Sequence, residues 1–229
     1  MKPPGRFITL EGLDGCGKST QLEMLAEHLR SQGHSVTSTR EPGGTRVGQQ
    51  IREVLLNASQ EAITPLTELS LMFAARAQHI EQLIRPALDR GELVLCDRFT
   101  DSSVAYQGYG RGVSLDIIGA LENLLCQGLR PDLTLILDID AATSLRRTAA
   151  RNRKAHQPNT RFEQEGLQFF ERVREGYLAI ARQEPHRVRN IDGSGTIEQL
   201  FAAVCLAVDE FLQSLPGVAG HQPGGGCGV

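Results

Sequence analysis

A glycine-rich segment near the start of the chain constrains the fold more than any other stretch. Residues 12–19 read G-L-D-G-C-G-K-S and fit the pattern G-x-x-x-x-G-K-[ST]. The apolar run 7–10 before this segment predicts a buried strand, and apolar residues at helical spacing over 22–29 predict a helix after it. A strand, a glycine turn and a helix are the context in which this pattern forms a phosphate-binding loop.

Each residue type in this loop has a physical role. The glycines let the backbone bend so that successive N–H groups point at phosphate oxygens. The Lys18 amine can reach the β- and γ-phosphates, and the Ser19 hydroxyl can ligate Mg²⁺. We therefore expect the whole segment to bind the phosphates of ATP, through Gly12, Leu13, Asp14, Gly15, Cys16, Gly17, Lys18, Ser19 and Thr20.

Composition excludes several classes of protein. The net charge of −3 gives no general attraction to nucleic acid or to a membrane surface. No apolar run is long enough to span a bilayer, and the first residues lack the apolar core of a signal peptide. The five cysteines are scattered without a C-x-x-C pair, so we expect neither disulfides nor a zinc site. A cytoplasmic protein that binds neither nucleic acid nor membrane is expected.

Strands and helices alternate along the chain, which predicts an α/β fold with a doubly wound, five-stranded parallel sheet flanked by helices. The 229 residues suit one domain over 1–216, with a small lid over 146–163 and a disordered glycine-rich tail over 217–229. We expect strands at 7–10, 34–39, 93–97, 133–139 and 188–192. Helices are expected at 18–31, 47–56, 65–84, 115–125, 142–150, 167–182 and 197–212, with a long polar loop at 98–112.

Two carboxylates lie at the ends of predicted strands, at the edge where ligands of such sheets bind. Asp97 is followed by Arg98, so that one residue could hold Mg²⁺ and the next a phosphate. A surface ion pair is the alternative for this pair. Asp138 could act similarly, or could cap its strand. The loop over 99–108 adds hydroxyls, an amide and an aromatic ring, which suit a sugar and a base.

Three further segments carry a resemblance to a known family. Residues 95–107 (L-C-D-R-F-T-D-S-S-V-A-Y-Q), 40–45 (R-E-P-G-G-T) and 73–79 (F-A-A-R-A-Q-H) resemble signature segments of thymidylate kinases. The resemblance extends over residues 6–212. It implies the fold of the P-loop NTPases, transfer of a phosphoryl group from Mg·ATP to dTMP giving dTDP, and a homodimer.

The resemblance also implies roles for individual residues. Lys18 and Arg98 would act on the transferred phosphoryl group, Asp14 would lie near the acceptor sugar, and Ser19 and Asp97 would bind the metal. The substrate-binding positions would be Arg40, Pro42, Phe73, Arg76, Arg98, Ser103, Tyr106 and Gln107.

One position departs from the family pattern. The family has a Phe four residues before the Arg that matches Arg76, where this chain has Met72. Either Phe73 stacks on the thymine after a small helix rotation, or Met72 packs against the ring through its polarisable sulfur.

The basic stretch 146–163 predicts a lid. Some thymidylate kinases carry an Arg within the phosphate-binding loop, where this chain has Gly15, so the sequence resembles the bacterial type in which a closing lid supplies the Arg. Arg151, Arg153 and Arg161 are the candidates for stabilising the charge of the transition state. A solvated basic helix end is the alternative interpretation.

Two other functions compete with this interpretation. A deoxynucleoside kinase shares the phosphate-binding loop but accepts an uncharged hydroxyl, so it needs a base and fewer arginines around its acceptor. A nucleotide-gated module would bind ATP without turnover. A GTPase is disfavoured because the sequence has no N-K-x-D motif.

Overall fold

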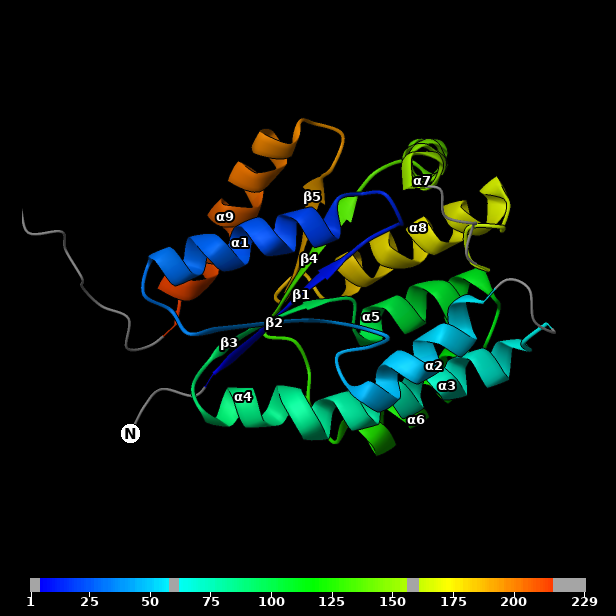
Figure 1. The fold of residues 1–229 in the computed structure, drawn as a ribbon, viewed down its shortest axis with the longest axis horizontal. Helices are drawn as coiled ribbons and strands as arrows, with labels where there is room; N and C mark the ends of the chain where they lie inside the picture. The colour runs from blue at the N-terminus through cyan, green and yellow to red at the C-terminus, as the bar shows by residue number, and fades with distance from the viewer. Residues whose placement is uncertain (1–4, 58–61, 156–160, 216–229) are drawn as a thin grey trace, which may run out of the picture.

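The computed structural model describes residues 5–57, 62–155 and 161–215, in which five parallel strands form one sheet (Figure 1). Their order is β2-β3-β1-β4-β5, so β1 is central and the chain passes from one half of the sheet to the other. The expected doubly wound parallel sheet is confirmed. The strands are β1 (Arg6–Glu11), β2 (Val36–Arg40), β3 (Leu93–Asp97), β4 (Leu133–Asp138) and β5 (Val188–Asp192).

Helices cover both faces of this sheet (Figure 1). Among the described residues, no helix is both long and apolar enough to cross a membrane. The helices that begin before β4 are α1 (Lys18–Ser31), α2 (Arg46–Leu56), α3 (Pro65–His79), η1 (Ile80–Ile84), α4 (Arg85–Asp89), α5 (Thr100–Ser103), η2 (Val104–Gly110) and α6 (Leu115–Cys126), where η marks a π-helix. Those that follow β4 are α7 (Ala141–Ala155), α8 (Leu167–Gln183) and α9 (Ile197–Gln213).

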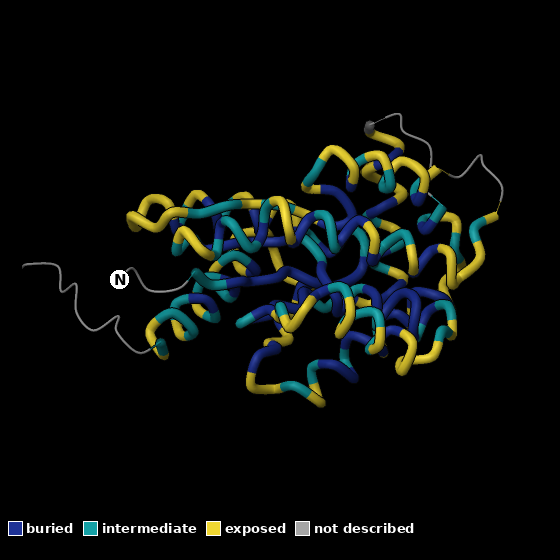
Figure 2. The backbone as a smooth tube through the Cα atoms, turned by 90° about the horizontal axis from the view of Figure 1, so that it is seen from below, coloured by how far each residue is buried: buried dark blue, intermediate teal, exposed yellow. Residues whose placement is uncertain are grey.

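Strands contribute side chains alternately to the two faces, and helices cover both faces of β1, β3 and β4, which are therefore mostly apolar and buried, whereas β2 and β5 at the two edges of the sheet are more polar and partly exposed. Ile8 and Leu10 pack under α1 and α9, whereas Phe7 packs against α3, η1, α4 and α6 on the opposite face. A third cluster joins Ile136 and Val188 to η2 and α8. Buried backbone accordingly runs through the centre of the molecule (Figure 2).

The segment 98–112 is largely helical, contrary to the long loop expected from its sequence. It forms α5 and η2, which pack against α8. Its glycines permit close packing rather than loop mobility, since a Cβ at Gly110 would lie 2.7 Å from the ring of Phe169. Its polar residues Ser102, Ser103 and Gln107 make buried or half-buried hydrogen bonds instead of facing solvent.

The expected tail over 217–229 lies outside the described residues, as do residues 156–160 of the expected lid. Within the described part of that lid, α7 continues as a helix to Ala155, and residues 161–165 return as a turn toward α8.

Candidate active site

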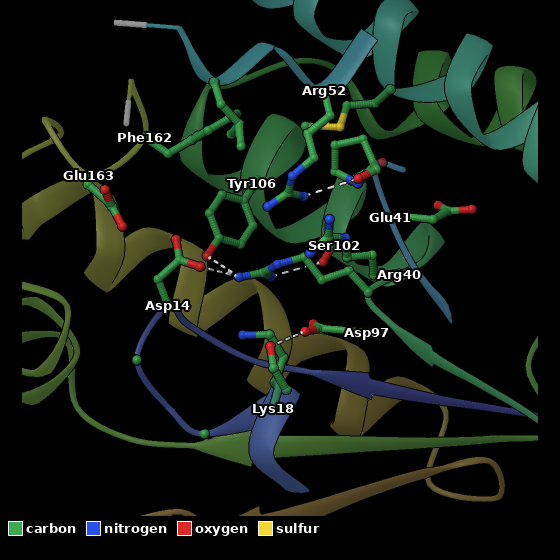
Figure 3. A pocket seen from close by; sticks show the side chains of 18 of the residues that line it. Asp14, Lys18, Arg40, Glu41, Arg52, Asp97, Ser102, Tyr106, Phe162 and Glu163 are labelled. Atoms are coloured by element: carbon green, nitrogen blue, oxygen red, sulfur yellow. Dashed lines mark hydrogen bonds and ion pairs between the residues drawn. The ribbon is translucent and has the colours of Figure 1, made fainter. Parts of the chain in front are cut away.

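A cavity of about 670 Å³ lies beyond the carboxyl ends of β1, β2 and β3 (Figure 3). Its walls come from the phosphate-binding loop, the segment between β2 and α2, helices α2, α3, α5, η2 and α7, and the turn after residue 160. Ligands of open parallel sheets bind at this edge because side chains from several strand ends converge there.

The phosphate-binding loop has the backbone that its glycines predict. Gly12, Gly15 and Gly17 have φ of 132°, 76° and 102°, which side-chain-bearing residues rarely adopt. The buried Lys18 amine donates to the carbonyl oxygens of Gly12 (3.1 Å) and Leu13 (2.8 Å). The loop thus holds a positive charge against its own backbone, at the start of α1.

Ser19 and Asp97 meet at the base of the cavity. The Ser19 hydroxyl donates to Oδ2 of Asp97 at 2.7 Å (Figure 3). The two side chains come from the start of α1 and the end of β3. Hard oxygen ligands of this kind suit Mg²⁺, which usually takes one or two protein oxygens and completes its shell with phosphate and water. No group of three or more His, Cys, Asp or Glu side chains in the described parts of the chain could hold a metal ion alone.

Arg98 is the best-connected side chain of the site. Its backbone is left-handed, with φ of 72°, which turns the guanidinium back over the phosphate-binding loop. It donates to Oδ1 of Asp14 at 2.8 Å and to the hydroxyls of Tyr106, Tyr177 and Ser102 at 3.1, 3.0 and 3.1 Å (Figure 3). Burial opposes ionisation of Asp14, but the charges of Arg98 and Lys18 outweigh it and lower its pKa. Asp14 is therefore a carboxylate at neutral pH.

Glu11 lies beneath this arrangement and was not predicted. It is fully buried at the end of β1. Its carboxyl group accepts from the backbone N–H of Phe99 (2.7 Å) and from the hydroxyls of Ser102 (2.6 Å) and Tyr177 (2.9 Å). Burial, reinforced by the nearby charge of Asp101, raises the pKa of Glu11 to about 7. Its sequence signal was a carboxylate directly after the buried run 7–10.

Arg76 is held on three sides at another wall of the cavity. Its Nε donates to Oε2 of Glu41 at 2.7 Å, and its terminal nitrogens donate to Oγ of Ser103 (3.1 Å) and the carbonyl oxygen of Phe99 (2.9 Å). The other oxygen of Glu41 lies 2.9 Å from Nδ1 of the buried His79. The ion pair of Glu41 with Arg76 and its hydrogen bond with His79 join the loop after β2 to α3.

Three guanidinium groups gather on the cavity wall. Arg40, Arg52 and Arg98 all line it, and Arg52 donates to the carbonyl oxygen of Pro42 at 3.0 Å (Figure 3). Burial and then the positive charges of Arg40 and Arg98 lower the pKa of Arg52. Like charges held together in this way favour an anionic ligand between them. Arg52 was not among the predicted site residues, although it shares one face of α2 with the buried Gly48 and Leu55.

The structure separates the two candidates for contact with the base. Phe73 is fully buried in the cluster around α3, 4.6 Å from the Arg76 guanidinium, and does not line the cavity. Met72 lines it. The placement of Phe73 against a ligand is therefore corrected, because its position on α3 points its ring into the core.

The three lid arginines occupy different environments. Arg151 lines the cavity and donates to Oε1 of Glu163 at 2.8 Å. Arg153 is exposed and lies outside the lining. Arg147, which was not predicted, lines the cavity one helical turn before Arg151 and donates to the carbonyl oxygen of Gly193 at 3.2 Å.

Arg161 is engaged elsewhere. It donates to Oε2 of the buried Glu68 at 2.5 Å and to the carbonyl oxygen of Leu55 at 3.1 Å, and it does not line the cavity. Its expected catalytic position is not supported by this geometry, because the carboxylate of α3 holds its guanidinium. Asp138 likewise lies outside the lining and forms a two-pronged ion pair with Arg174 at 2.7 and 2.8 Å.

Most of the residues expected at the site line this one cavity. These are Asp14, Gly15, Gly17, Lys18, Ser19, Thr20, Arg40, Pro42, Arg76, Asp97, Arg98, Ser103, Tyr106, Gln107 and Arg151. Expected residues outside the lining are Gly12, Leu13, Cys16, Phe73, Arg153 and Arg161. The remaining lining residues were not predicted individually, although all but Arg52 and Leu56 lie in segments that the sequence indicated: Glu41, Arg52, Leu56, Ser102, Arg147, Asn152, Phe162 and Glu163.

Comparisons with known proteins agree on one family. The family model described as thymidylate kinase matches residues 10–204. A thymidylate kinase of Pseudomonas entomophila is 54% identical over 214 residues, covering 93% of this chain and 96% of that protein. One of Pelobacter propionicus is 48% identical over 205 residues, covering 89% and 94%. The crystal structure of thymidylate kinase from Ehrlichia chaffeensis matches with a TM-score of 0.73 at 34% identity, covering 90% of this chain and 99% of that one.

Proposed function

The chain belongs to the thymidylate kinase family, and from this premise we propose how its cavity transfers a phosphoryl group from ATP to dTMP. The reaction gives dTDP and ADP and serves the synthesis of dTTP. The observation that carries the proposal is the gathering of Arg40, Arg52 and Arg98 opposite the Lys18 loop. A charged acceptor needs such a wall, whereas an uncharged nucleoside hydroxyl does not.

ATP occupies the part of the cavity next to the phosphate-binding loop. The loop N–H groups and the start of α1 receive the β- and γ-phosphates. The Lys18 amine turns from the carbonyl oxygens of Gly12 and Leu13 toward those phosphates. Thr20 lies beside them in the cavity lining.

Ser19 and Asp97 are the residues that would hold Mg²⁺. The pair offers a hydroxyl and a carboxylate oxygen 2.7 Å apart at the edge of the phosphate site, which fits a cation held mainly by phosphates and water. When bound, the ion supplies positive charge that neutralises the phosphate oxygens.

The acceptor dTMP binds across the cavity with its phosphate among Arg40, Arg52 and Arg98. Arg76, Gln107 and Met72 then surround the base. Ser103, Tyr106 and Pro42 complete the wall, and the ionised Asp14 lies near the sugar.

In the transfer step an oxygen of the dTMP phosphate attacks the γ-phosphorus of ATP, and the bond to the β,γ-bridging oxygen breaks in line. The attacking oxygen is already anionic, so no strong base is required. Lys18 and Arg98 stabilise the charge on the equatorial oxygens, and Asp14 fixes the Arg98 guanidinium at 2.8 Å. Positioning and electrostatics thus supply most of the catalysis.

The described part of the lid contributes Arg151. Of its basic residues, Arg147 and Arg151 line the cavity, and Glu163 holds Arg151. Residues 146–163 act as a lid of the single domain that spans 1–216. Closure of this segment excludes water, which suppresses hydrolysis of ATP.

The enzyme acts as a homodimer. Four large apolar side chains are exposed on α3 and α6, which pack side by side (Figure 1). A second copy of the chain would cover this surface. The four exposed side chains are Leu66 (54% exposed), Leu115 (48%), Ile117 (43%) and Leu124 (69%).

The cysteines in the described residues are free thiols, which accords with the reducing cytoplasm in which we place the enzyme.

Release of ADP from Mg·ATP tests the function. We expect strong turnover with dTMP, little with thymidine or AMP, and little without acceptor. Arg52→Met should raise KM for dTMP with little change in KM for ATP, because Arg52 faces the acceptor side. Arg146→Met removes an exposed Arg of α7 outside the lining and should leave both values unchanged. Turnover with thymidine would instead indicate a nucleoside kinase, and ATP binding without acceptor-dependent turnover would indicate a binding module.

A further inference from the structure

Glu68 is a buried carboxylate that the transfer mechanism does not use. It lies on α3 with no exposed surface. Its two oxygens have different partners: Oε1 accepts from Nε2 of Gln107 at 2.7 Å, and Oε2 accepts from Arg161 at 2.5 Å. Arg111 contributes a second guanidinium, with Nε 3.4 Å from the carboxylate. Glu68 therefore connects η2, which lines the cavity, to the turn at the end of the lid.

This contact fixes which end of the Gln107 amide enters the cavity. A carboxylate between two guanidinium groups accepts hydrogen bonds and donates none, so the atom of Gln107 that faces it must be the NH₂ group. The carbonyl Oε1 has no hydrogen-bond partner among the described residues, and it is not one of the enclosed polar atoms that lack one. Since Gln107 is otherwise buried and lines the cavity, its carbonyl oxygen is open to the cavity.

We propose that Glu68 is a specificity-determining positioning residue that holds the Gln107 amide with its carbonyl oxygen toward the base. The enzyme thereby selects a pyrimidine that carries an N–H at position 3 and rejects cytosine. This inference rests on the placement of the base beside Arg76 and Gln107 in the function proposed above.

The chemistry of the two bases explains the selection. Thymine and uracil carry a donor N3–H beside an acceptor O4, whereas cytosine carries a bare acceptor N3 beside a donor amine. A fixed carbonyl oxygen pairs with N3–H but repels the lone pair of cytosine N3. The donor-only Arg76 likewise pairs with O4 and not with the cytosine amine. A site whose buried polar groups are left unpaired by the wrong substrate discriminates far more strongly than one that only measures shape.

The variant Glu68→Gln is expected to reverse the orientation of the Gln107 side-chain amide. Arg161 and Arg111 donate only, and Arg161 makes the shorter contact (2.5 Å against 3.4 Å for Arg111), so Arg161 keeps the single carbonyl oxygen of the new side chain and the new NH₂ group faces Gln107. Gln107 must then turn its own carbonyl oxygen to that donor and present its NH₂ group to the base. We expect the ratio of kcat/KM for dTMP to kcat/KM for dCMP to fall by at least about tenfold, since the NH₂ group of Gln107 can pair with N3 of cytosine but not with N3–H of thymine.

Arg161→Met is the matched control. It removes the ion pair and loosens the turn at the end of the lid, but it leaves the carboxylate that holds Gln107. We expect lower activity with both acceptors and an unchanged ratio. The proposal is overturned if a folded Glu68→Gln enzyme keeps the ratio within about twofold of the unmodified enzyme, or if Arg161→Met lowers it equally.

A measurement on the unmodified enzyme covers the case in which Glu68→Gln does not fold. The side-chain amide protons of Gln107, assigned by NMR from their loss in Gln107→Met, should exchange slowly with solvent because a buried carboxylate accepts one of them. Rapid exchange would refute the fixed amide. Absence of dTMP-dependent ADP release in the unmodified enzyme would instead refute the proposed function, so the two failures are distinguishable.

Discussion

Replacing Glu11 with glutamine should change how the stability of the fold depends on pH. In the folded protein burial raises the pKa of this carboxyl group from 4.5 to about 7. Between these two values the folded state keeps a proton that the unfolded state has lost. The contribution of Glu11 to stability is therefore fully present below pH 4.5 and is lost as the pH rises through about 7.

The size of the effect follows from the displacement of the pKa, which corresponds to about 3 kcal/mol of unfolding free energy. Glutamine removes the titration but keeps a carbonyl oxygen for the Phe99 N–H. Its amide can donate to the hydroxyl of Ser102 or Tyr177, whose protons rotate to suit. The variant should consequently gain about 3 kcal/mol relative to the unmodified protein between pH 4.5 and pH 8.

Urea denaturation at matched protein concentration, from pH 4.5 to pH 8, measures this difference directly. Other titrating groups shift both proteins alike, so the difference between the two curves isolates Glu11. Parallel curves would refute the reasoning, since they would mean that the buried carboxyl group titrates near its ordinary pKa.

Three further variants test individual contacts. Met72→Ala should raise KM for dTMP by about tenfold and leave KM for ATP unchanged, because it removes apolar surface from the cavity wall; an unchanged KM for dTMP would place the base elsewhere. Arg98→Lys should lower kcat by about 10²–10³ at saturating substrates, since an amine cannot replace the forked contacts; a loss below tenfold would contradict that role. Gly44→Ala should lower the melting temperature more than Gly112→Ala. Both have φ above +70°, but only the first Cβ meets a neighbour, 2.3 Å from Nε2 of His79; equal losses would show that backbone strain alone acts.

The sequence was sufficient to predict the sheet and the phosphate-binding loop. Apolar runs, helical spacing of apolar residues and glycine turns are local signals that identify strands, helices and turns. Because parallel strands need crossover helices, the alternation of these elements predicts a parallel sheet. The segment 98–112 was predicted wrongly as a loop for the same reason. Its glycines and polar residues are typical of loops, and only their neighbours on α8 explain a helix there.

The site residues that could not be predicted from the sequence depend on tertiary contacts. Arg161 fits the pattern of a lid arginine, yet its carboxylate partner lies 93 residues earlier in the chain. Spacing along the chain carries no information about such a pair. Phe73 and Met72 are adjacent, and a rotation of α3 by one residue decides which of them reaches the cavity. Arg52 could have been found, because a charged residue on a buried helical face needs an explanation.

Gly15 has a consequence for how this enzyme could change through evolution or design. A Cβ at this position would lie 2.9 Å from Oγ1 of Thr148, 3.1 Å from Cβ of Arg147 and 3.1 Å from the carbonyl oxygen of Ser144, all on α7. The loop and the lid helix thus compete for one volume above the phosphates. An arginine grafted into the loop would displace α7 before it could assist transfer, so a mutational path from lid arginine to loop arginine must alter both elements together. A change in only one of the two elements therefore meets a steric conflict.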